Sequence, residues 1–168
     1  MKIVLIGYMA SGKSAVGLKL SNKYNLPFVD LDAYIEKKEK KTISTIFKEK
    51  GEIYFRLKEA EYLEELLTSN ENLVLSLGGG TPCYGNNMDV IIKNSISYYL
   101  KTSINTIHSR LILEKNKRPL VANIKEENLS EFIAKHLFER SIFYQRSNKT
   151  ITTDQHTIDE VVDMIEFD

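Results

Sequence analysis

The chain has 168 residues, 42% hydrophobic and 27% charged, with 23 basic and 23 acidic side chains and a formal net charge of zero. This balance, with no dominant basic block, argues against a nucleic-acid-binding protein, and the sequence has no run of about 18 apolar residues that would span a membrane. The single cysteine, Cys83, excludes an internal disulfide and a multi-cysteine zinc site. We therefore expect one globular domain over residues 1–168, in a reducing, cytoplasmic setting.

The N-terminal residues predict a strand over residues 3–7 that leads into a phosphate-binding loop. Residues 7–14, Gly-Tyr-Met-Ala-Ser-Gly-Lys-Ser, match the pattern G-x-x-x-x-G-K-[ST]. In that motif backbone N–H groups hold the phosphates, the lysine reaches the β/γ oxygens and the hydroxyl reaches Mg²⁺. A helix over residues 13–24 should follow, with its N-terminus directed at the anion. The motif predicts a protein that handles a nucleoside triphosphate, without identifying the phosphate acceptor.

Two acidic residues follow next in the chain. We expect residues 28–32, Phe-Val-Asp-Leu-Asp, to form a second strand. Alternation along a strand would place Asp30 and Asp32 on the same side, at the carboxyl end where ligands bind in open α/β sheets. One carboxylate could then hold Mg²⁺ through water, and the other could orient or deprotonate an attacking hydroxyl. The alternative is a helix-capping residue beside a surface acid.

Helical segments are expected between the second and third strands. Residues 33–41 predict a polar helix, and Thr42 or Ser44 can cap a short helix that ends at Gly51. Residues 52–67 predict a longer helix. Its candidate buried positions are Phe55, Tyr62, Leu63, Leu66 and Leu67.

Two features of this middle part could bind an anionic substrate. Arg56 and Glu59 share a helix face, so the guanidinium is either part of a surface ion pair or is fixed by Glu59 to bind a carboxylate. Residues 73–77 predict a buried strand by their continuous apolar run, and the three glycines of residues 78–80 follow it. Those glycines are either a flexible turn or a backbone that lets a ligand come close.

The next part of the chain predicts a strand over residues 96–100 and a helix capped by Ser103 that extends to Leu113. Residues 114–124 are polar, with Arg118 before a proline. This segment is either a disordered surface loop or a lid that closes over the triphosphate, excludes water and brings Arg118 to the transferring group.

The C-terminal part completes an alternation of strands and helices. Residues 129–144 predict a long helix carrying Arg140 and Tyr144, followed by a strand over residues 150–153 and a helix over residues 157–165. Strands separated by helices predict an α/β fold with a parallel sheet covered on both faces. Alone, Arg140 is more often structural. We interpret His108, His136, His156 and Cys83 as ordinary residues without a ligand role.

Taken together and in order, these features resemble the shikimate kinase family, from Ile3 to about Ile165. Outside the phosphate loop each feature is weak alone, but their joint order and spacing are specific. The resemblance is carried by Gly7–Ser14, Asp30-x-Asp32, Phe55-Arg56-x-x-Glu59, Gly78–Gly80, Arg118-Pro119-Leu120 and Arg140-x-x-x-Tyr144.

The resemblance implies a three-layer αβα fold with a five-stranded parallel sheet, similar to the nucleoside monophosphate kinases. It implies a mobile lid at about residues 114–124 and a substrate-binding region at about residues 32–60. The implied reaction transfers the γ-phosphoryl group of ATP to the 3-hydroxyl of shikimate, giving shikimate 3-phosphate and ADP on the route through chorismate to aromatic amino acids. Mg²⁺ is the implied cofactor, and a monomer with no nucleic-acid or membrane partner is expected.

The same resemblance assigns roles to individual residues. Lys13 stabilises the transferring phosphate, Asp32 binds the acceptor hydroxyl as base or orienting group, and Arg118 is the arginine of the lid. Ser14 ligates Mg²⁺, and Asp30 contacts it through water. The residues implied to bind ATP are Gly7, Ala10, Ser11, Gly12, Lys13, Ser14, Ala15, Arg110, Arg118 and Gln155. The residues implied to bind shikimate are Asp32, Arg56, Gly78, Gly79, Gly80 and Arg140.

The sequence departs from the family pattern at three places. Leu31 replaces a small hydroxylated residue, and residues 76–77, Ser-Leu, precede the glycines where a threonine is common. Residues 153–156, Thr-Asp-Gln-His, lack the arginine that some members place near adenine. We therefore expect the phosphoryl-transfer chemistry to be retained, while the adenine contacts are less well defined.

Two other functions remain open at this point. One is a kinase for another small polyol acid such as gluconate, which would also need an arginine for the carboxylate. The other is a regulatory nucleotide-binding module that has lost catalysis. The presence of Lys13, Asp32 and Arg118 argues against the second alternative.

Overall fold

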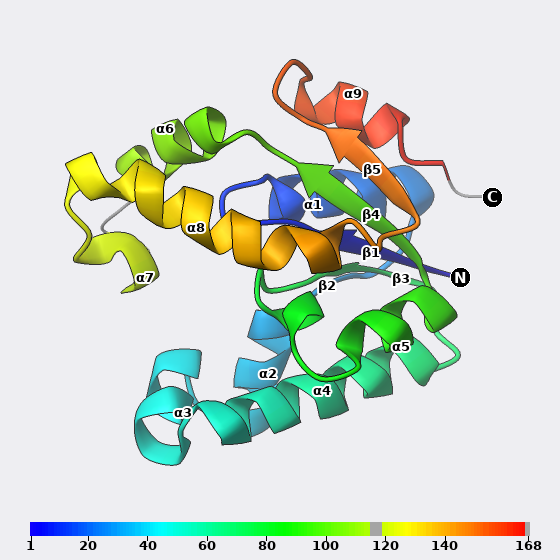
Figure 1. Cartoon of the computed structure of the whole chain (residues 1–168). Coiled ribbons are helices and arrows are strands. Elements are labelled where there is room, and N and C mark those ends of the chain that lie inside the picture. Colours follow the sequence, from blue (N-terminus) through cyan, green and yellow to red (C-terminus); the bar gives the residue numbers. More distant parts are fainter. Residues whose placement is uncertain (115–118, 167–168) are drawn as a thin grey trace.

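The computed structural model describes residues 1–114 and 119–166. At its centre is a five-stranded sheet in the order β2-β3-β1-β4-β5 (Figure 1), with every neighbouring pair parallel. The strands are β1 (Lys2–Ile6), β2 (Phe28–Asp30), β3 (Leu73–Ser76), β4 (Ile96–Lys101) and β5 (Lys149–Thr152). The structure thus confirms the expected three-layer αβα architecture with a parallel sheet.

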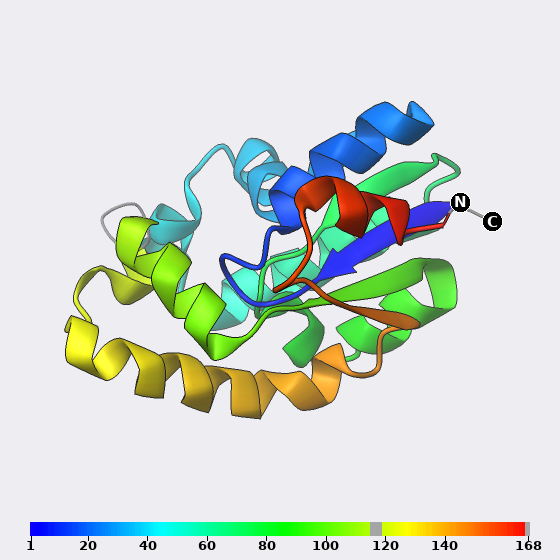
Figure 2. The same ribbon diagram turned by 90° about the horizontal axis from the view of Figure 1, so that it is seen from above.

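Helices cover both faces of this sheet. On one face lie α1 (Lys13–Tyr24) and α9 (Ile158–Asp163), which Figures 1 and 2 show side by side. The other helices lie on the opposite side and share the larger core cluster. They are α2 (Leu31–Glu39), α3 (Ile43–Lys50), α4 (Glu52–Thr68), α5 (Asn87–Asn94), α6 (Ile104–Glu114), α7 (Pro119–Ala122) and α8 (Glu126–Tyr144), with a short 3₁₀ helix, η1 (Thr81–Cys83). Of these, α3 packs on α2 and α4 rather than on the sheet itself.

Successive side chains of β1 point to opposite faces of the sheet and so belong to two separate halves of the core. Ile3 and Leu5 belong to the cluster under α1 and α9, and Val4 and Ile6 belong to the larger cluster under the other helices. All four side chains are fully buried. Because both faces of β1 are covered, the strand is apolar at successive positions, which is typical of a parallel sheet.

The register of the strands brings three functional segments to one edge. Leu5 of β1 pairs with Ser76 of β3, and Ser76 also pairs with Asp30 of β2. The segments that leave these strands at their carboxyl ends are therefore neighbours. They are the phosphate loop after β1, the first turn of α2 after β2 and the glycines of residues 78–80 after β3. Ligands of open α/β sheets bind at this kind of position.

The predicted strand over residues 28–32 is wrong at its end. β2 stops at Asp30, and Asp32 lies in the first turn of α2. Asp30 has extended backbone angles, and its Oδ1 accepts a hydrogen bond from the Ala33 N–H at 3.2 Å, so it caps the helix. The two carboxylates reach the same region because the strand turns into a helix between them, and not by alternation along a strand.

Other expected elements agree with the structure within a few residues. The helix over residues 13–24 is confirmed, and Thr42 rather than Ser44 caps α3 by accepting from the Thr45 N–H. The five candidate buried residues of α4 are all buried. η1, α5 and α7 were not expected. α7 falls in the segment interpreted as a polar loop or lid, and its Val121 is buried in the core. In the part of the chain that the structure describes, no helix is long and apolar enough to cross a membrane.

Candidate active site

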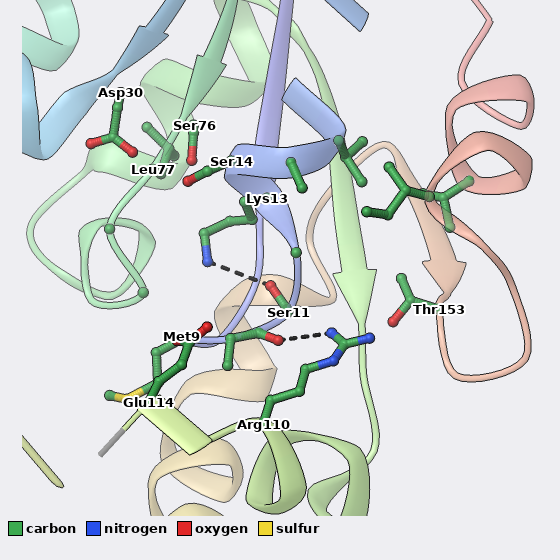
Figure 3. Close-up of a pocket in the computed structure, with 18 of the residues that line it drawn as sticks. Met9, Ser11, Lys13, Ser14, Asp30, Ser76, Leu77, Arg110, Glu114 and Thr153 are labelled. Carbon is green, nitrogen blue, oxygen red and sulfur yellow. Dashed lines mark hydrogen bonds between the residues drawn. The ribbon is translucent and has the colours of Figure 1, made fainter. Parts of the chain in front are cut away.

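A cavity of about 510 Å³ lies at the carboxyl edge of the sheet (Figure 3). The phosphate loop with the start of α1, Asp30, Asp32 and the segment from Ser76 to Gly79 form one part of its wall. The rest is formed by two residues of α6 and by residues in and just before α9: Arg110, Glu114, Thr153, His156, Ile158 and Val161. Of the predicted site residues, those that line it are Ala10, Ser11, Gly12, Lys13, Ser14, Ala15, Asp30, Asp32, Gly78, Gly79 and Arg110.

The N-terminus of α1 is built to receive an anion. Its N-cap is Gly12, which adopts a left-handed conformation with φ of 94° and has no side chain to bond the first-turn N–H groups. By contrast, side chains of Asp30, Thr42 and Thr157 cap α2, α3 and α9. The N–H groups at the start of α1, together with the helix dipole, therefore suit a phosphate.

The phosphate loop is held in place by its own residues and by α6. The Lys13 ammonium group donates hydrogen bonds to the carbonyl oxygens of Gly7 at 2.8 Å and Tyr8 at 2.9 Å. Ala10 has a φ of 60°, which costs a residue with a Cβ about 1 kcal/mol. Its carbonyl oxygen accepts a hydrogen bond of 2.8 Å from Arg110 Nη1. Arg110 thus stabilises the strained turn of the loop as well as lining the cavity.

Asp30 and Asp32 both line the cavity on the side of Ser14, as Figure 3 shows for Asp30. Burial, together with the charges of Asp30 and Glu59, raises the pKa of Asp32 to about 6, although Lys13 acts in the opposite direction. A carboxyl group with this pKa accepts a proton readily at neutral pH, as a base or an orienting group for a hydroxyl must.

Each glycine of residues 78–80 (the glycine turn) lies against one predicted functional side chain. A Cβ atom on Gly78 would lie 3.1 Å from Asp32 Oδ1, and one on Gly79 would lie 3.1 Å from Arg140 Nη1. A Cβ on Gly80 would lie 3.0 Å from Arg56 Nη2. The absence of side chains therefore lets a carboxylate and two guanidinium groups converge on one short segment of backbone.

Arg56 is fixed by a buried acid on its own helix. Its Nη1 donates to Glu59 Oε1 at 2.8 Å, and the Glu59 side chain is 1% exposed. Glu59 Oε2 accepts a hydrogen bond of 2.7 Å from Thr81, whose backbone carbonyl accepts from the Asn87 side chain at 2.9 Å. The i, i+3 pair expected from the sequence is confirmed, and the structure adds that Thr81 and Asn87 anchor it to η1 and α5.

One face of α8 joins the glycine turn to the phosphate loop. His136, Arg140 and Tyr144 are spaced four residues apart and so share a face. The Tyr144 hydroxyl donates to the Gly79 carbonyl oxygen at 2.5 Å, and His136 Nδ1 is 3.0 Å from the hydroxyl of Tyr8. Burial raises the pKa of Tyr8 to about 12, so its hydroxyl stays protonated near neutral pH.

Some predicted site residues lie elsewhere or are not described. Gly7, Arg56, Gly80 and Arg140 do not line the cavity, although both arginines reach the glycine turn. Gln155 is exposed, and its neighbours Thr153 and His156 line the cavity instead. Arg118 lies outside the described residues.

Sequence reasoning missed several side chains of this region. Thr81, Asn87, Tyr8 and His136 make the contacts given above, and Tyr84 lies over the guanidinium of Arg56. The only signal for any of them was the spacing of His136, four residues before Arg140. Within residues 1–114 and 119–166 there is no group of three or more His, Cys, Asp or Glu side chains that could hold a metal ion. A divalent cation in this cavity would therefore need phosphate oxygens or water among its ligands.

Known proteins of one family are similar to this chain in sequence and in fold. A family model described as shikimate kinase matches residues 9–166. A shikimate kinase from Flavobacterium johnsoniae is 51% identical over 162 residues, which cover 96% of this chain and 94% of that protein.

Two solved structures are also similar to the chain. The crystal structure of shikimate kinase from Bacteroides thetaiotaomicron has a TM-score of 0.90 at 32% identity, covering 98% of this chain and 95% of that one. A shikimate kinase from Acinetobacter baumannii in complex with shikimate has a TM-score of 0.85 at 32% identity, covering 97% and 89%.

The buried charge of Asp32 should lower the stability of the fold. The folded-state pKa of Asp32, about 6, lies above the ordinary value of 3.8. The free-energy cost of ionising this carboxyl group in the folded protein is therefore nearly absent below pH 4 and grows as the pH rises to 6. It amounts to about 0.5 kcal/mol at pH 4 and about 3 kcal/mol at pH 7. We expect Asp32→Asn to raise the free energy of unfolding of the metal-free, nucleotide-free protein at pH 7, with a much smaller gain at pH 4.

Urea unfolding with EDTA at both pH values measures this difference. Asp159→Asn, on the exposed face of α9, is the matched control and should change stability little. An Asp32→Asn variant that is less stable than the parent at pH 7 would show that the ionised carboxylate is stabilised where it lies.

Proposed function

The chain belongs to the shikimate kinase family, and we infer that it transfers the γ-phosphoryl group of ATP to the 3-hydroxyl of shikimate, giving shikimate 3-phosphate and ADP. It is thus an ATP-dependent small-molecule kinase of aromatic amino acid biosynthesis. The proposal for its mechanism divides the site into a nucleotide side at α1 and an acceptor side at the glycine turn.

On the nucleotide side, the phosphates bind at the start of α1. Gly7, Ala10, Ser11, Gly12 and Ala15 supply backbone around them, and Lys13 neutralises charge that develops on the transferring phosphoryl group. The contacts of Lys13 to the Gly7 and Tyr8 carbonyl oxygens support this role, because they fix its ammonium group at the loop. Arg110 lies against the adenine. Gln155 stays a predicted adenine contact that the cavity lining does not support.

The residues of the cavity fit a magnesium ion. Ser14 and Asp30 line it together, and Asp32 lines it beside them. Hydroxyl, carboxylate and phosphate oxygens are the ligands that Mg²⁺ prefers. We propose that Ser14 ligates the ion and Asp30 contacts it through water. The bound ion would supply electrostatic stabilisation of the phosphate oxygens.

On the acceptor side, the carboxylate of shikimate binds between Arg56 and Arg140, along Gly79 and Gly80. Guanidinium groups suit this role because they present paired N–H donors to a carboxylate. The hydroxyl to be phosphorylated lies at Asp32, beside Gly78. Asp32 accepts or orients its proton while the oxygen attacks the γ-phosphorus, and the bond to the β–γ bridging oxygen breaks to release ADP.

The observation that carries this proposal is the glycine turn. Its three residues lie against Asp32, Arg140 and Arg56 in turn. A carboxylate that can accept a hydroxyl proton and two guanidinium cations that can bind a carboxylate therefore flank one site beside the phosphate loop. A small hydroxy acid with these two groups held apart by a ring matches this arrangement. A regulatory module without catalysis would have no need of it.

We propose that residues 114–124 form a lid over the substrates and that Arg118 stabilises the transferring group. We also propose that residues 32–60 form the substrate-binding region of a single P-loop kinase domain over residues 1–168. We also propose that the protein is a monomer in the cytoplasm and that it acts without nucleic acid or membrane. Burial raises the pKa of Cys83 to about 11, which suits a thiol with no reactive role.

Substrate choice can be tested directly by ADP release. We expect ADP release with ATP, Mg²⁺ and shikimate, and background release when gluconate replaces shikimate.

The role of Asp32 is tested by the Asp32→Asn variant. Asp32→Asn should reduce turnover at least about 10²-fold, because proton acceptance at the attacking hydroxyl is lost, while calorimetry should show ATP binding within about twofold of the parent. Release driven by gluconate alone would contradict the assignment, and near-normal turnover of Asp32→Asn would contradict its role.

The glycine turn can be tested at Gly80. Its φ of −87° suits any residue, so Gly80→Ala should fold, but its Cβ would push the Arg56 guanidinium away. We expect the KM for shikimate to rise about tenfold, with the KM for ATP and the melting temperature nearly unchanged. The matched control is Gly85→Ala, where a Cβ meets nothing within 4 Å, although its φ of 53° makes a small loss of stability expected. An unchanged shikimate KM in Gly80→Ala would mean that Arg56 does not act at this turn.

A further inference from the structure

Tyr84, just beyond η1, covers the guanidinium group of Arg56. The Arg56 Cζ atom lies 3.8 Å from the centroid of the Tyr84 ring, which is the geometry of a cation–π contact. The Tyr84 side chain is partly open to solvent, at 38% relative exposure, whereas the Arg56 side chain is 19% exposed. The ring therefore lies between the guanidinium and solvent.

The same tyrosine is tied to a second residue that faces Arg56. Its hydroxyl donates a hydrogen bond of 3.1 Å to Glu52 Oε1, and that oxygen also lies 3.7 Å from Arg56 Nε. Arg56 Nε is buried and has no hydrogen-bond partner within the described part of the chain. Glu52 is one helical turn before Arg56. The Tyr84 ring and the Glu52 carboxylate, joined by their hydrogen bond, therefore both lie against the guanidinium group of Arg56.

The contacts of Arg56 hold Nη1, Nε and one face of its guanidinium group, and they leave Nη2 beside Gly80. Nη1 donates to Glu59, Nε faces Glu52, and the ring of Tyr84 contacts the guanidinium group. Nη2 lies against Gly80, 3.0 Å from the position that a Cβ would take there. A long arginine side chain otherwise loses much rotational freedom when it binds a ligand, and a guanidinium already held in place loses less.

We propose that Tyr84 is a positioning residue for the acceptor's carboxylate: it holds the Arg56 guanidinium against Gly80 in the orientation that binds the carboxylate. This inference rests on the carboxylate-binding role of Arg56 proposed above. Tyr84 acts through Arg56 and does not touch the reacting atoms. Loss of its ring should therefore weaken binding of the acceptor without changing the phosphoryl-transfer step.

Kinetics of Tyr84→Leu and Tyr84→Phe test the proposal. We expect Tyr84→Leu to raise the KM for shikimate about three- to tenfold, as loss of a cation–π contact of ordinary strength implies. The KM for ATP and kcat should stay within about twofold of the parent. Tyr84→Phe keeps the ring and loses only the hydrogen bond to Glu52, so it should restore most of the affinity. Because the side chain is partly exposed, both variants should fold, and thermal melting checks this.

Tyr54→Leu is the matched control. Tyr54 also donates its hydroxyl to a glutamate, Glu39, at 2.8 Å. It stands two positions before Arg56 on α4, about 200° around the helix, and so faces a different side. Although Tyr54 lies within the broad segment 32–60, its hydroxyl and ring contact Glu39 and Lys50, so its substitution should leave the KM for shikimate unchanged. An equal rise in both leucine variants would indicate a general loss of packing and would overturn the proposal.

A double-mutant cycle with Arg56→Ala separates this inference from the proposed function. Tyr84→Leu should have no further effect on the shikimate KM in the Arg56→Ala background. It should also have little effect in the parent background when the methyl ester of shikimate replaces the acid. If Arg56→Ala raises the KM but Tyr84→Leu does not, the inference fails while the role of Arg56 stands. If Arg56→Ala leaves the KM unchanged, the carboxylate site itself is wrongly placed.

Discussion

The contact between the glycine turn and three side chains, Asp32, Arg140 and Arg56, is the constraint on which the proposed site depends. β3 is hydrogen-bonded to both β1 and β2, so the segment that leaves it lies between the phosphate loop and the two aspartates. With no Cβ at Gly78, Gly79 or Gly80, Asp32, Arg140 and Arg56 approach the backbone to about 3 Å from where a Cβ would stand. A side chain at any of the three would separate the groups that the proposed mechanism brings together.

Several charged or strained groups around this turn lower the stability of the fold. Burial and neighbouring acids raise the pKa of Asp32, while Glu59, almost fully buried, fixes Arg56. Ala10 in the phosphate loop adopts a left-handed conformation that a residue with a Cβ rarely takes. Such costs are common at active sites, where the rest of the fold compensates for them. Here the compensation comes from the apolar core on both faces of β1.

Much of the fold and of the candidate site could be predicted from the sequence, because several of the sequence patterns involved are local. The phosphate loop and α1 follow from an eight-residue motif after an apolar strand, and the Arg56–Glu59 pair follows from helical spacing. The position of Asp32 in a helix could not be predicted from the sequence. Asp30 ends β2 and caps α2, but an Asp-x-Asp pattern fits a continuous strand equally well. The contacts of Tyr84 with Arg56 and of Tyr8 with His136 join residues 28 and 128 positions apart. No periodicity marks such pairs, so only the folded chain reveals them.

The central claim is that one short turn holds the acceptor by its carboxylate and presents its hydroxyl to Asp32. A crystal structure of the protein with shikimate and Mg²⁺·ADP tests it most directly. The account predicts the carboxylate within about 3 Å of guanidinium nitrogens of both Arg56 and Arg140, and a ring hydroxyl within hydrogen-bonding distance of Asp32. A carboxylate bound away from both arginines, or a hydroxyl turned away from Asp32, would contradict it.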